Sequence, residues 1–362
     1  MFPYCIVAIG ALFYGISAAP TDDAAPEGPP NETRYALALT DEAALAAGLR
    51  TPGADKGNAL LLQPSFTYRA GDRWIVSTSL AGLAHTESGT GEQVRVREAY
   101  FGLSEGDFDF TIGKRLLRWG TGYAFTATGV LDPPRAATDP SDRLSLNEGR
   151  EMAKVDWVHD GQDVTVAWAS AGVLGQSRTG MYDTTAVRYN VLVKGFDTSV
   201  IAAHDGGDAN IGGGNFTRVF GDALELHGEF AWRQGAAVLA GGKYTIPSGV
   251  TFIGEFYTPP NTAYFRPAQM PASAGRQHYA YAGVSKARLR ELPGWKEWNV
   301  SVALVENLDD RSHIAVIDGG RLIGDHFYAY THIQAPAGKR GRSEYGAISY
   351  SALVSLGVRF QL

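Results

Sequence analysis

The residues from Val354 to Leu362 read Val-Ser-Leu-Gly-Val-Arg-Phe-Gln-Leu, with an apolar side chain at every second position. Successive side chains of a β-strand point to opposite faces, so this stretch predicts a strand with one apolar and one polar face. Chain ends fray unless pairing holds them. Closure of a transmembrane β-barrel provides such pairing, because it joins the last strand to the first. The stretch therefore favours a closed barrel, although a strand of a soluble protein can show the same alternation.

The composition is that of a large, strand-rich protein. The 362 residues are 44% hydrophobic and 19% charged, which is too apolar for a disordered chain. Glycine accounts for 44 residues, far above its usual share of about 7%, and no Gly-X-Y period explains them. The 38 acidic residues outnumber the 32 lysines and arginines, which argues against a nucleic-acid partner.

The first residues predict a targeting segment ahead of the strands. Residues 1–19 contain an apolar run with the only cysteine and end on small residues, as in a secretory signal peptide cleaved near Ala18 or Ala19. No lysine or arginine precedes the run, and a retained membrane helix, which needs about 20 apolar residues, is the alternative. Residues 20–33 are acidic and rich in proline, so we expect a disordered lead-in before a barrel over residues 34–362.

From Arg34 onward, apolar and polar residues alternate in segments that recur about every ten to fourteen residues, the spacing of strands joined by turns. The clearest segment is 224–233, where Leu, Gly, Phe and Trp alternate with Glu, His, Ala and Arg. A change of phase after Val96 predicts a β-bulge. Short turns and long connections largely alternate, as they do when a barrel has short turns at one rim and long loops at the other. The long connections are expected at 86–92, 116–149, 172–183, 206–213, 259–276 and 334–349.

These features predict an all-β fold, a transmembrane antiparallel up-and-down β-barrel of about 16–18 strands. The Leu, Val, Phe and Trp of each strand would face lipid, where a midplane arginine or lysine costs about 2–4 kcal/mol, and the charged face would line a wet lumen. In a soluble sandwich the two faces would exchange roles. Aromatic residues near strand ends would form girdles at headgroup depth. The candidates are Tyr68, Trp74, Trp119, Tyr123, Trp157, Trp168, Tyr257, Tyr264, Trp295, Trp298, Phe327 and Tyr330.

The segment 113–151 has the most distinctive sequence. A basic strand end with Arg115 and Arg118 leads into Trp-Gly-Thr-Gly at 119–122, followed by a loop rich in proline, aspartate and arginine. This pattern resembles bacterial outer-membrane porin-like β-barrels, in which an Arg-rich strand, a Trp-Gly-x-Gly turn and a Pro/Asp-rich loop recur. The resemblance in motif is confined to this segment and to 352–362. The last residue is leucine rather than an aromatic residue, which departs from the family.

The resemblance implies a channel of the bacterial outer membrane through which small polar solutes or ions diffuse passively, without a reaction, cofactor or metal. It implies contact with outer-membrane lipid and with barrel-assembly machinery, and it leaves a homo-oligomer open. The loop 116–149 would fold into the lumen and narrow it, since rings of charged side chains select ions in pores; an external loop is the alternative. The residues expected at the lumen or its constriction are Arg115, Arg118, Asp132, Arg135, Asp139, Asp142, Arg143, Glu148, Arg150, Arg188, Glu229 and Arg233.

Other functional classes have less support in the sequence. His204 and Asp205 invite a metal or acid–base interpretation, but the surrounding stretch lacks the spacing of an EF-hand, and a glycine-rich external hairpin explains it. No Gly-x-Ser-x-Gly nucleophile motif occurs. A barrel hydrolase, a structural or surface-binding barrel with a plugged lumen, and a soluble secreted β-protein are the alternatives that stay open.

Overall fold

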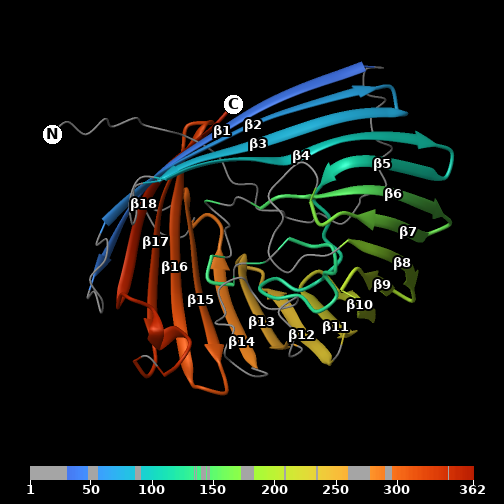
Figure 1. The fold of residues 1–362 in the computed structure, drawn as a ribbon. Helices are drawn as coiled ribbons and strands as arrows, with labels where there is room; N and C mark the ends of the chain where they lie inside the picture. The colour runs from blue at the N-terminus through green and yellow to red at the C-terminus, as the bar shows by residue number, and fades with distance from the viewer. Residues whose placement is uncertain are drawn as a thin grey trace.

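The fold is an antiparallel sheet that closes on itself (Figure 1). The computed structural model describes residues 31–47, 56–85, 91–133, 135, 137–139, 144, 147–172, 183–207, 209–233, 235–259, 278–289, 296–340 and 342–362. Within these residues, 18 strands pair in chain order around the ring. They are β1 (Asn31–Ala47), β2 (Lys56–Ala70), β3 (Trp74–His85), β4 (Gly91–Glu105), β5 (Phe108–Arg115), β6 (Arg150–His159), β7 (Gln162–Ala169), β8 (Thr184–Val193), β9 (Phe196–Asp205), β10 (Ala209–Phe220), β11 (Leu224–Trp232), β12 (Ala236–Thr245), β13 (Val250–Thr258), β14 (Tyr279–Lys286), β15 (Trp298–Asn307), β16 (Ser312–Ile323), β17 (Phe327–Ala337) and β18 (Ala352–Gln361). The predicted all-β up-and-down barrel is confirmed.

The ring is closed by the C-terminal strand, as its alternation predicts. β18 pairs with β1 from Ala38–Gln361 to Ala47–Ala352, and it pairs with β17 on its other side. Because every strand then has two neighbours, no unpaired strand edge is exposed along this seam.

One tyrosine fastens the seam on the inside of the barrel. Tyr330 of β17 extends across β18, and its hydroxyl donates a hydrogen bond to Glu42 of β1 at 2.8 Å. The ring passes over Gly357, where a Cβ would lie only 2.2 Å from it. Glycine at this position of β18 therefore lets one side chain connect three strands.

Exposure alternates along the strands as the sequence predicts. In β18 the side chain of Leu356 is 58% exposed, whereas its neighbour Ser355 is buried. In β7 the large apolar side chains of Val166 and Trp168 are exposed, and Ala167 between them is buried. The outward surface of the barrel is therefore apolar, as a surface against hydrocarbon requires.

The inner face is polar in some places and apolar in others. On β9, β12, β13 and β15, the inward side chains Ile201, Leu239, Tyr257 and Val305 are buried in one apolar cluster. Residues of the long connection 116–149 pack into the same cluster, among them Trp119, Phe125 and Leu131. Part of the barrel interior is thus a packed core rather than open lumen.

Aromatic side chains gather at the rim of short turns. Trp74 contacts Phe101 with ring centroids 5.2 Å apart, and Phe327 contacts Phe360 at 5.6 Å. Four predicted girdle residues are instead inside the barrel, because two belong to the inward-folded connection and two lie on the inward phase of their strands. These four are Trp119, Tyr123, Tyr257 and Tyr330. Tyr264 and Trp295 lie outside the described residues.

The connections largely follow the predicted division between two rims, although the connection 287–297 on the short-turn rim is long and 233–235 and 308–311 on the other rim are short. One predicted long loop also differs. β10 begins at Ala209, so the expected loop 206–213 shrinks to residues 206–208. The glycines of β10 fit a strand because large aromatic side chains of β11 lie opposite them: Gly214 pairs with Phe230. The long loop expected at 206–213 is therefore wrong, whereas the expected glycine-rich hairpin is present and consists of β9, β10 and the short turn that joins them.

The predicted bulge is present in β4. Ser79 of β3 pairs with Glu98, whereas the next residue pairs with Val96, which leaves Arg97 outside the ladder. The carbonyl of Arg97 accepts a hydrogen bond from Gly149 N–H at 2.8 Å. The bulge thus holds the last residue of the long connection before β6.

The chain ahead of the barrel stays a prediction. β1 begins at Asn31 rather than at Arg34, so the strand starts inside the segment expected to be disordered. The signal peptide expected over 1–19 and residues 20–30 lie outside the described part of the chain. Among the described residues no helix is long and apolar enough to cross a membrane.

Candidate functional site

The most distinctive part of the interior consists of the described residues of the long connection 116–149 between β5 and β6, which fold into the barrel (Figure 1). Its apolar side chains are buried: Trp119, Phe125 and Leu131 are each 5% exposed or less. Phe125 stacks on Tyr257 of β13, with ring centroids 5.1 Å apart and an interplanar angle of 11°. The connection therefore packs on the inner wall on the side of β9 to β15, and we call it the inner loop.

A glycine with an unusual backbone conformation lies near the end of β5, two residues before the strand ends and the inner loop begins. Gly113 has φ of +122°, and a Cβ there would lie 2.3 Å from the Ala99 carbonyl oxygen, so a side chain is excluded. The next residue, Lys114, is buried and forms an ion pair with Glu148 near the other end of the inner loop. Arg95 of β4 pairs with the same carboxylate.

These pairs determine the titration of Glu148. Burial raises the pKa of its carboxyl, but the hydrogen bonds from Arg95 and Lys114 outweigh burial, so the pKa lies below its ordinary value. The carboxylate form is thus the one that holds the loop.

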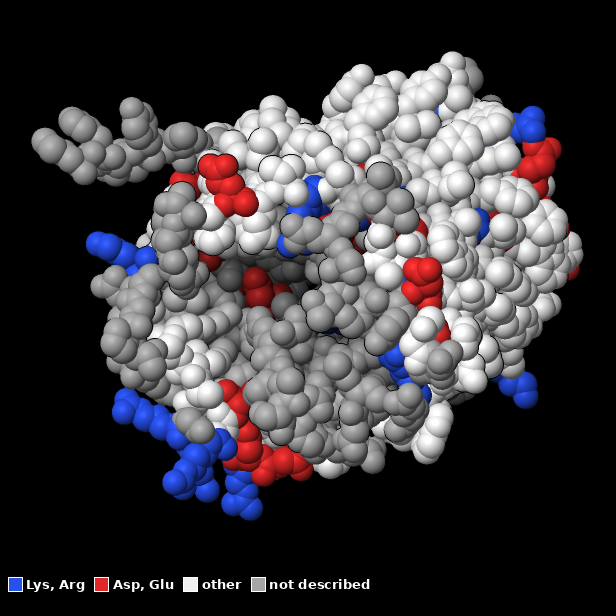
Figure 2. Space-filling view, viewed as in Figure 1, with Lys and Arg blue, Asp and Glu red and all other residues white. Residues whose placement is uncertain are grey.

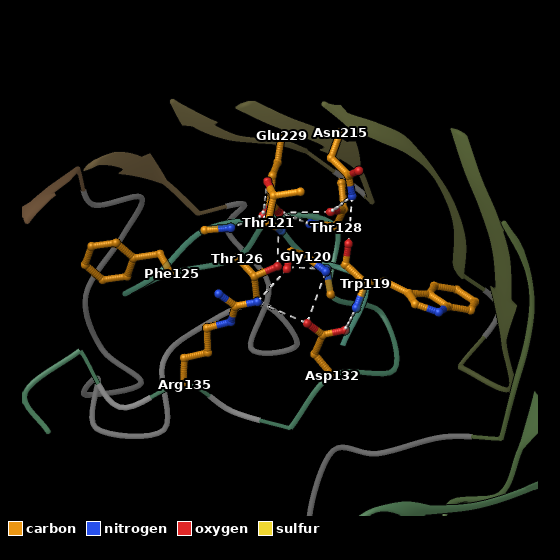
Figure 3. Close-up of polar contacts among 12 residues, drawn as sticks. Trp119, Gly120, Thr121, Phe125, Thr126, Thr128, Asp132, Arg135, Asn215 and Glu229 are labelled. Carbon is orange, nitrogen blue, oxygen red and sulfur yellow. Dashed lines mark hydrogen bonds and ion pairs between the residues drawn. The ribbon is translucent and has the colours of Figure 1, made fainter. Parts of the chain in front are cut away.

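Glu229 of β11 is the main anchor of the inner loop (Figure 3). Its buried carboxylate accepts hydrogen bonds from four backbone N–H groups, those of Thr121, Gly122, Ala127 and Thr128, at 2.6–2.8 Å. The hydroxyls of Thr121, Thr126 and Thr128 donate to it as well. A buried charge is tolerated only where donors surround it, and the curled backbone of 121–128 supplies them.

Glu255 of β13 is a second anchor. It accepts the backbone N–H groups of Tyr123, Ala124 and Phe125, the last two at 2.9 and 3.2 Å. His227 of β11 lies 3.1 Å from the same carboxylate through Nε2. Both anchors therefore bind backbone rather than side-chain charge, which fixes the position of the loop without an ion pair.

Within the inner loop, Asp132 links its two arms. It accepts the backbone N–H groups of Trp119 and Gly120 at 2.6 and 3.2 Å, and Arg135 lies 3.4 Å from it (Figure 3). Arg135 also donates to the Gly120 carbonyl at 2.7 Å. Burial raises the pKa of the Asp132 carboxyl above its ordinary value, although Arg135 opposes this. Asn215 of β10 ties the same arms to the wall by donating to the Trp119 carbonyl at 2.8 Å.

Tyr123 is the part of the loop that faces the open interior. Its side chain is 40% exposed, and its hydroxyl donates to Glu225 at 2.7 Å. Lys243 pairs with Glu225 at 3.0 Å and lies over the Tyr123 ring, 5.2 Å from its centroid. Burial raises the pKa of the Tyr123 hydroxyl to about 12, with Lys243 acting in the opposite direction. The hydroxyl thus stays a proton donor to Glu225 at neutral pH.

The structure brings only some of the predicted constriction residues together. Four of them hold the inner loop, and their charged groups form the hydrogen bonds and ion pairs that fix it. These are Asp132, Arg135, Glu148 and Glu229. Arg188 contacts the loop through the ring of Trp119, 5.8 Å away, and pairs with Asp163 at 2.9 Å.

The remaining predicted residues lie elsewhere. Arg150 is buried and donates to the Ala169 carbonyl and to Thr184, and Arg233 pairs with Asp205, so both are structural. Arg115 lies over the Tyr100 ring, 4.8 Å from its centroid, and Arg118 is exposed. Asp139 is half-buried, and Asp142 and Arg143 lie outside the described residues.

The sequence places Glu255 and His227 on the polar face of their strands, but it predicts neither them nor Asn215 at the constriction. All three stand on the inward phase of their strands, which is the one signal available from the sequence. Their partners in the inner loop lie more than ninety positions away along the chain. Asn215 and Trp119, for example, are 96 positions apart. No local pattern connects such residues.

Comparison with known proteins gives likeness in fold alone. No protein-family model and no curated protein matches the sequence. Among solved structures, OpdL of Pseudomonas aeruginosa has a TM-score of 0.62 at 10% identity, covering 91% of this chain and 99% of OpdL. OprD of the same organism has a TM-score of 0.58 at 9% identity, with 91% and 95% covered. Wzi of Escherichia coli has a TM-score of 0.58 at 10% identity, with 89% and 83% covered. The chain therefore has a porin-like barrel fold.

Proposed function

We propose that this protein is a channel of the bacterial outer membrane, through which small polar solutes diffuse passively past the inner loop. The observation that carries the proposal is the pair of anchors, Glu229 and Glu255, which hold a long connection inside a closed barrel with an apolar exterior. A barrel of 16–18 strands encloses an aqueous lumen unless something fills it. The inner loop occupies part of that space and leaves the remainder as the path.

The polar side chains along the path support solutes that are themselves polar. Among the inward side chains, Lys154 of β6 pairs with Asp156, and Tyr123 of the inner loop donates to Glu225 of β11. Charges of both signs are thus presented to a passing solute, and rings of such side chains determine which ions pass.

The test is single-channel recording of the full-length protein in a planar bilayer. The double variant Glu229→Gln/Glu255→Gln replaces carboxylates with amides, whose N–H groups face the loop's own donors. We expect the loop to detach and the conductance to rise by about twofold or more. Asp109→Asn is the matched control, because Asp109 is bonded to Ser104 rather than to the loop.

A wild-type protein that inserts without any conductance would overturn the proposal. An unchanged conductance in the double variant, with a folded barrel, would show instead that the loop does not narrow the path.

A binding barrel is the second candidate, and the packed apolar cluster inside the barrel favours it. Wzi is an outer-membrane, carbohydrate-binding β-barrel involved in capsule assembly. For this candidate we expect no conductance and retention of the purified protein on an immobilised polysaccharide. Single-channel recording therefore distinguishes the two candidates, because only the channel conducts.

A further inference from the structure

Four cations lie together at the rim of long connections, and we call them the basic ridge. Arg311 is in the turn between β15 and β16, and Lys339, Arg340 and Arg342 follow β17. All four are exposed, and none forms an ion pair with another described residue. Figure 2 shows Lys and Arg side chains projecting at the lower left edge of the molecule, where Figure 1 places the connection after β17.

Hydrogen bonds hold the ridge in a fixed shape. The N–H groups of Arg342 and Ser343 both donate to the Lys339 carbonyl at 3.1 Å, and the Ser343 hydroxyl donates to it at 2.9 Å. The connection is tied to the neighbouring turn by Tyr345 N–H, which donates to the Ser312 hydroxyl at 3.2 Å. The backbone that carries Lys339 and Arg342 is therefore held beside the turn that carries Arg311.

The acidic residues beside the ridge are already engaged. Asp310 accepts the backbone N–H groups of Ser312 and Glu344, each at 2.7 Å. Glu344 accepts hydrogen bonds from Tyr279 and Asn307 at 2.8 Å. These carboxylates keep their negative charge, but they are turned toward other donors, and no described acidic side chain forms an ion pair with the ridge.

The ridge lies where a membrane surface would meet the barrel. The outward residues of β17 end at Ala337, and Lys339 comes two residues later. A polar connection that directly follows an apolar outward face lies at headgroup depth. Lysine supplies a compact charge and arginine a planar fork, and both recognise phosphate.

We propose that the basic ridge binds the phosphate groups of anionic lipids in the leaflet next to the long connections. The proposal depends on the membrane location given under the proposed function. It goes further by naming a lipid headgroup as a partner and four side chains as its receptor.

The test uses the full-length protein in detergent, with lipid binding read by native mass spectrometry. The probes are diphosphorylated lipid A, phosphatidylcholine and inorganic phosphate. We expect lipid A to bind about tenfold more strongly than phosphatidylcholine and to weaken as salt is added. In Lys339→Gln/Arg340→Gln/Arg342→Gln, that preference should fall by about tenfold.

Lys194→Asn/Lys296→Gln is the matched control, because it removes two exposed charges at the opposite rim. It should bind lipid A as the wild type does. Equal binding of both lipids, or full lipid A binding by the triple variant, would overturn the proposal. Competition by inorganic phosphate at equal concentration would indicate a small-anion site instead. The triple variant should keep the wild-type conductance, so failure here is distinguishable from failure of the channel proposal.

Discussion

At the scale of single residues, the interior depends on carboxylates that bind backbone. Glu229 and Glu255 are on the inward phase of β11 and β13, as the alternation of the sequence predicts for both. Their role does not follow from the sequence, because they accept hydrogen bonds from N–H groups of a loop about a hundred residues away. Gly122, for example, precedes Glu229 by 107 positions. The sequence therefore predicts which side chains face inward but not which of them meet.

A residue-scale prediction concerns Gly113, near the end of β5. Gly113→Ala places a Cβ 2.3 Å from the Ala99 carbonyl oxygen at φ of +122°, so we expect a loss of about 1–3 kcal/mol in unfolding free energy. Urea titration in detergent micelles measures the loss. Gly82→Ala is the control, because a Cβ there meets nothing within 4 Å. Equal stability of both variants would contradict the strain argument.

At the scale of elements, the inner loop is a piece of core that belongs to no strand. The pattern of Trp119 and Tyr123 beside a strand end predicts an interfacial girdle, which is wrong because the chain turns inward after β5 ends at Arg115. A girdle and an inward turn produce the same local sequence. The strands themselves are predictable because their two-residue period is a local pattern. It is strong here because one face of each strand meets hydrocarbon and the other meets the barrel interior.

An element-scale prediction concerns pH. The folded-state pKa of Glu148 is depressed, so its contribution to stability is present above the ordinary carboxyl pKa and is lost as pH falls through the folded value. We expect the wild type to be more heat-stable than Glu148→Gln at pH 7, and the difference to shrink below about pH 4. Melting curves of the two proteins, followed by circular dichroism, measure it. A difference that grows on acidification would contradict the assignment of the Arg95 and Lys114 pairs.

At the scale of the whole molecule, closure and an apolar exterior have a joint consequence for handling. The outward faces carry large apolar side chains all around the ring, for example Val200, Phe230 and Leu304. We expect the protein to need detergent in solution, and to migrate differently on a denaturing gel before and after boiling, because a closed barrel resists the detergent until heated. Identical mobility in both lanes would contradict closure.

The pairing of β1 with β18 has a kinetic consequence. Joining strands about three hundred residues apart costs about 5 kcal/mol in chain entropy, and it yields nothing until the intervening strands have formed. The seam is thus the late step of folding, and until then two strand edges are open to aggregation. The closing step of a barrel with this topology is therefore slow. A chaperone that shields the first strand until the last strand arrives would prevent aggregation during that time.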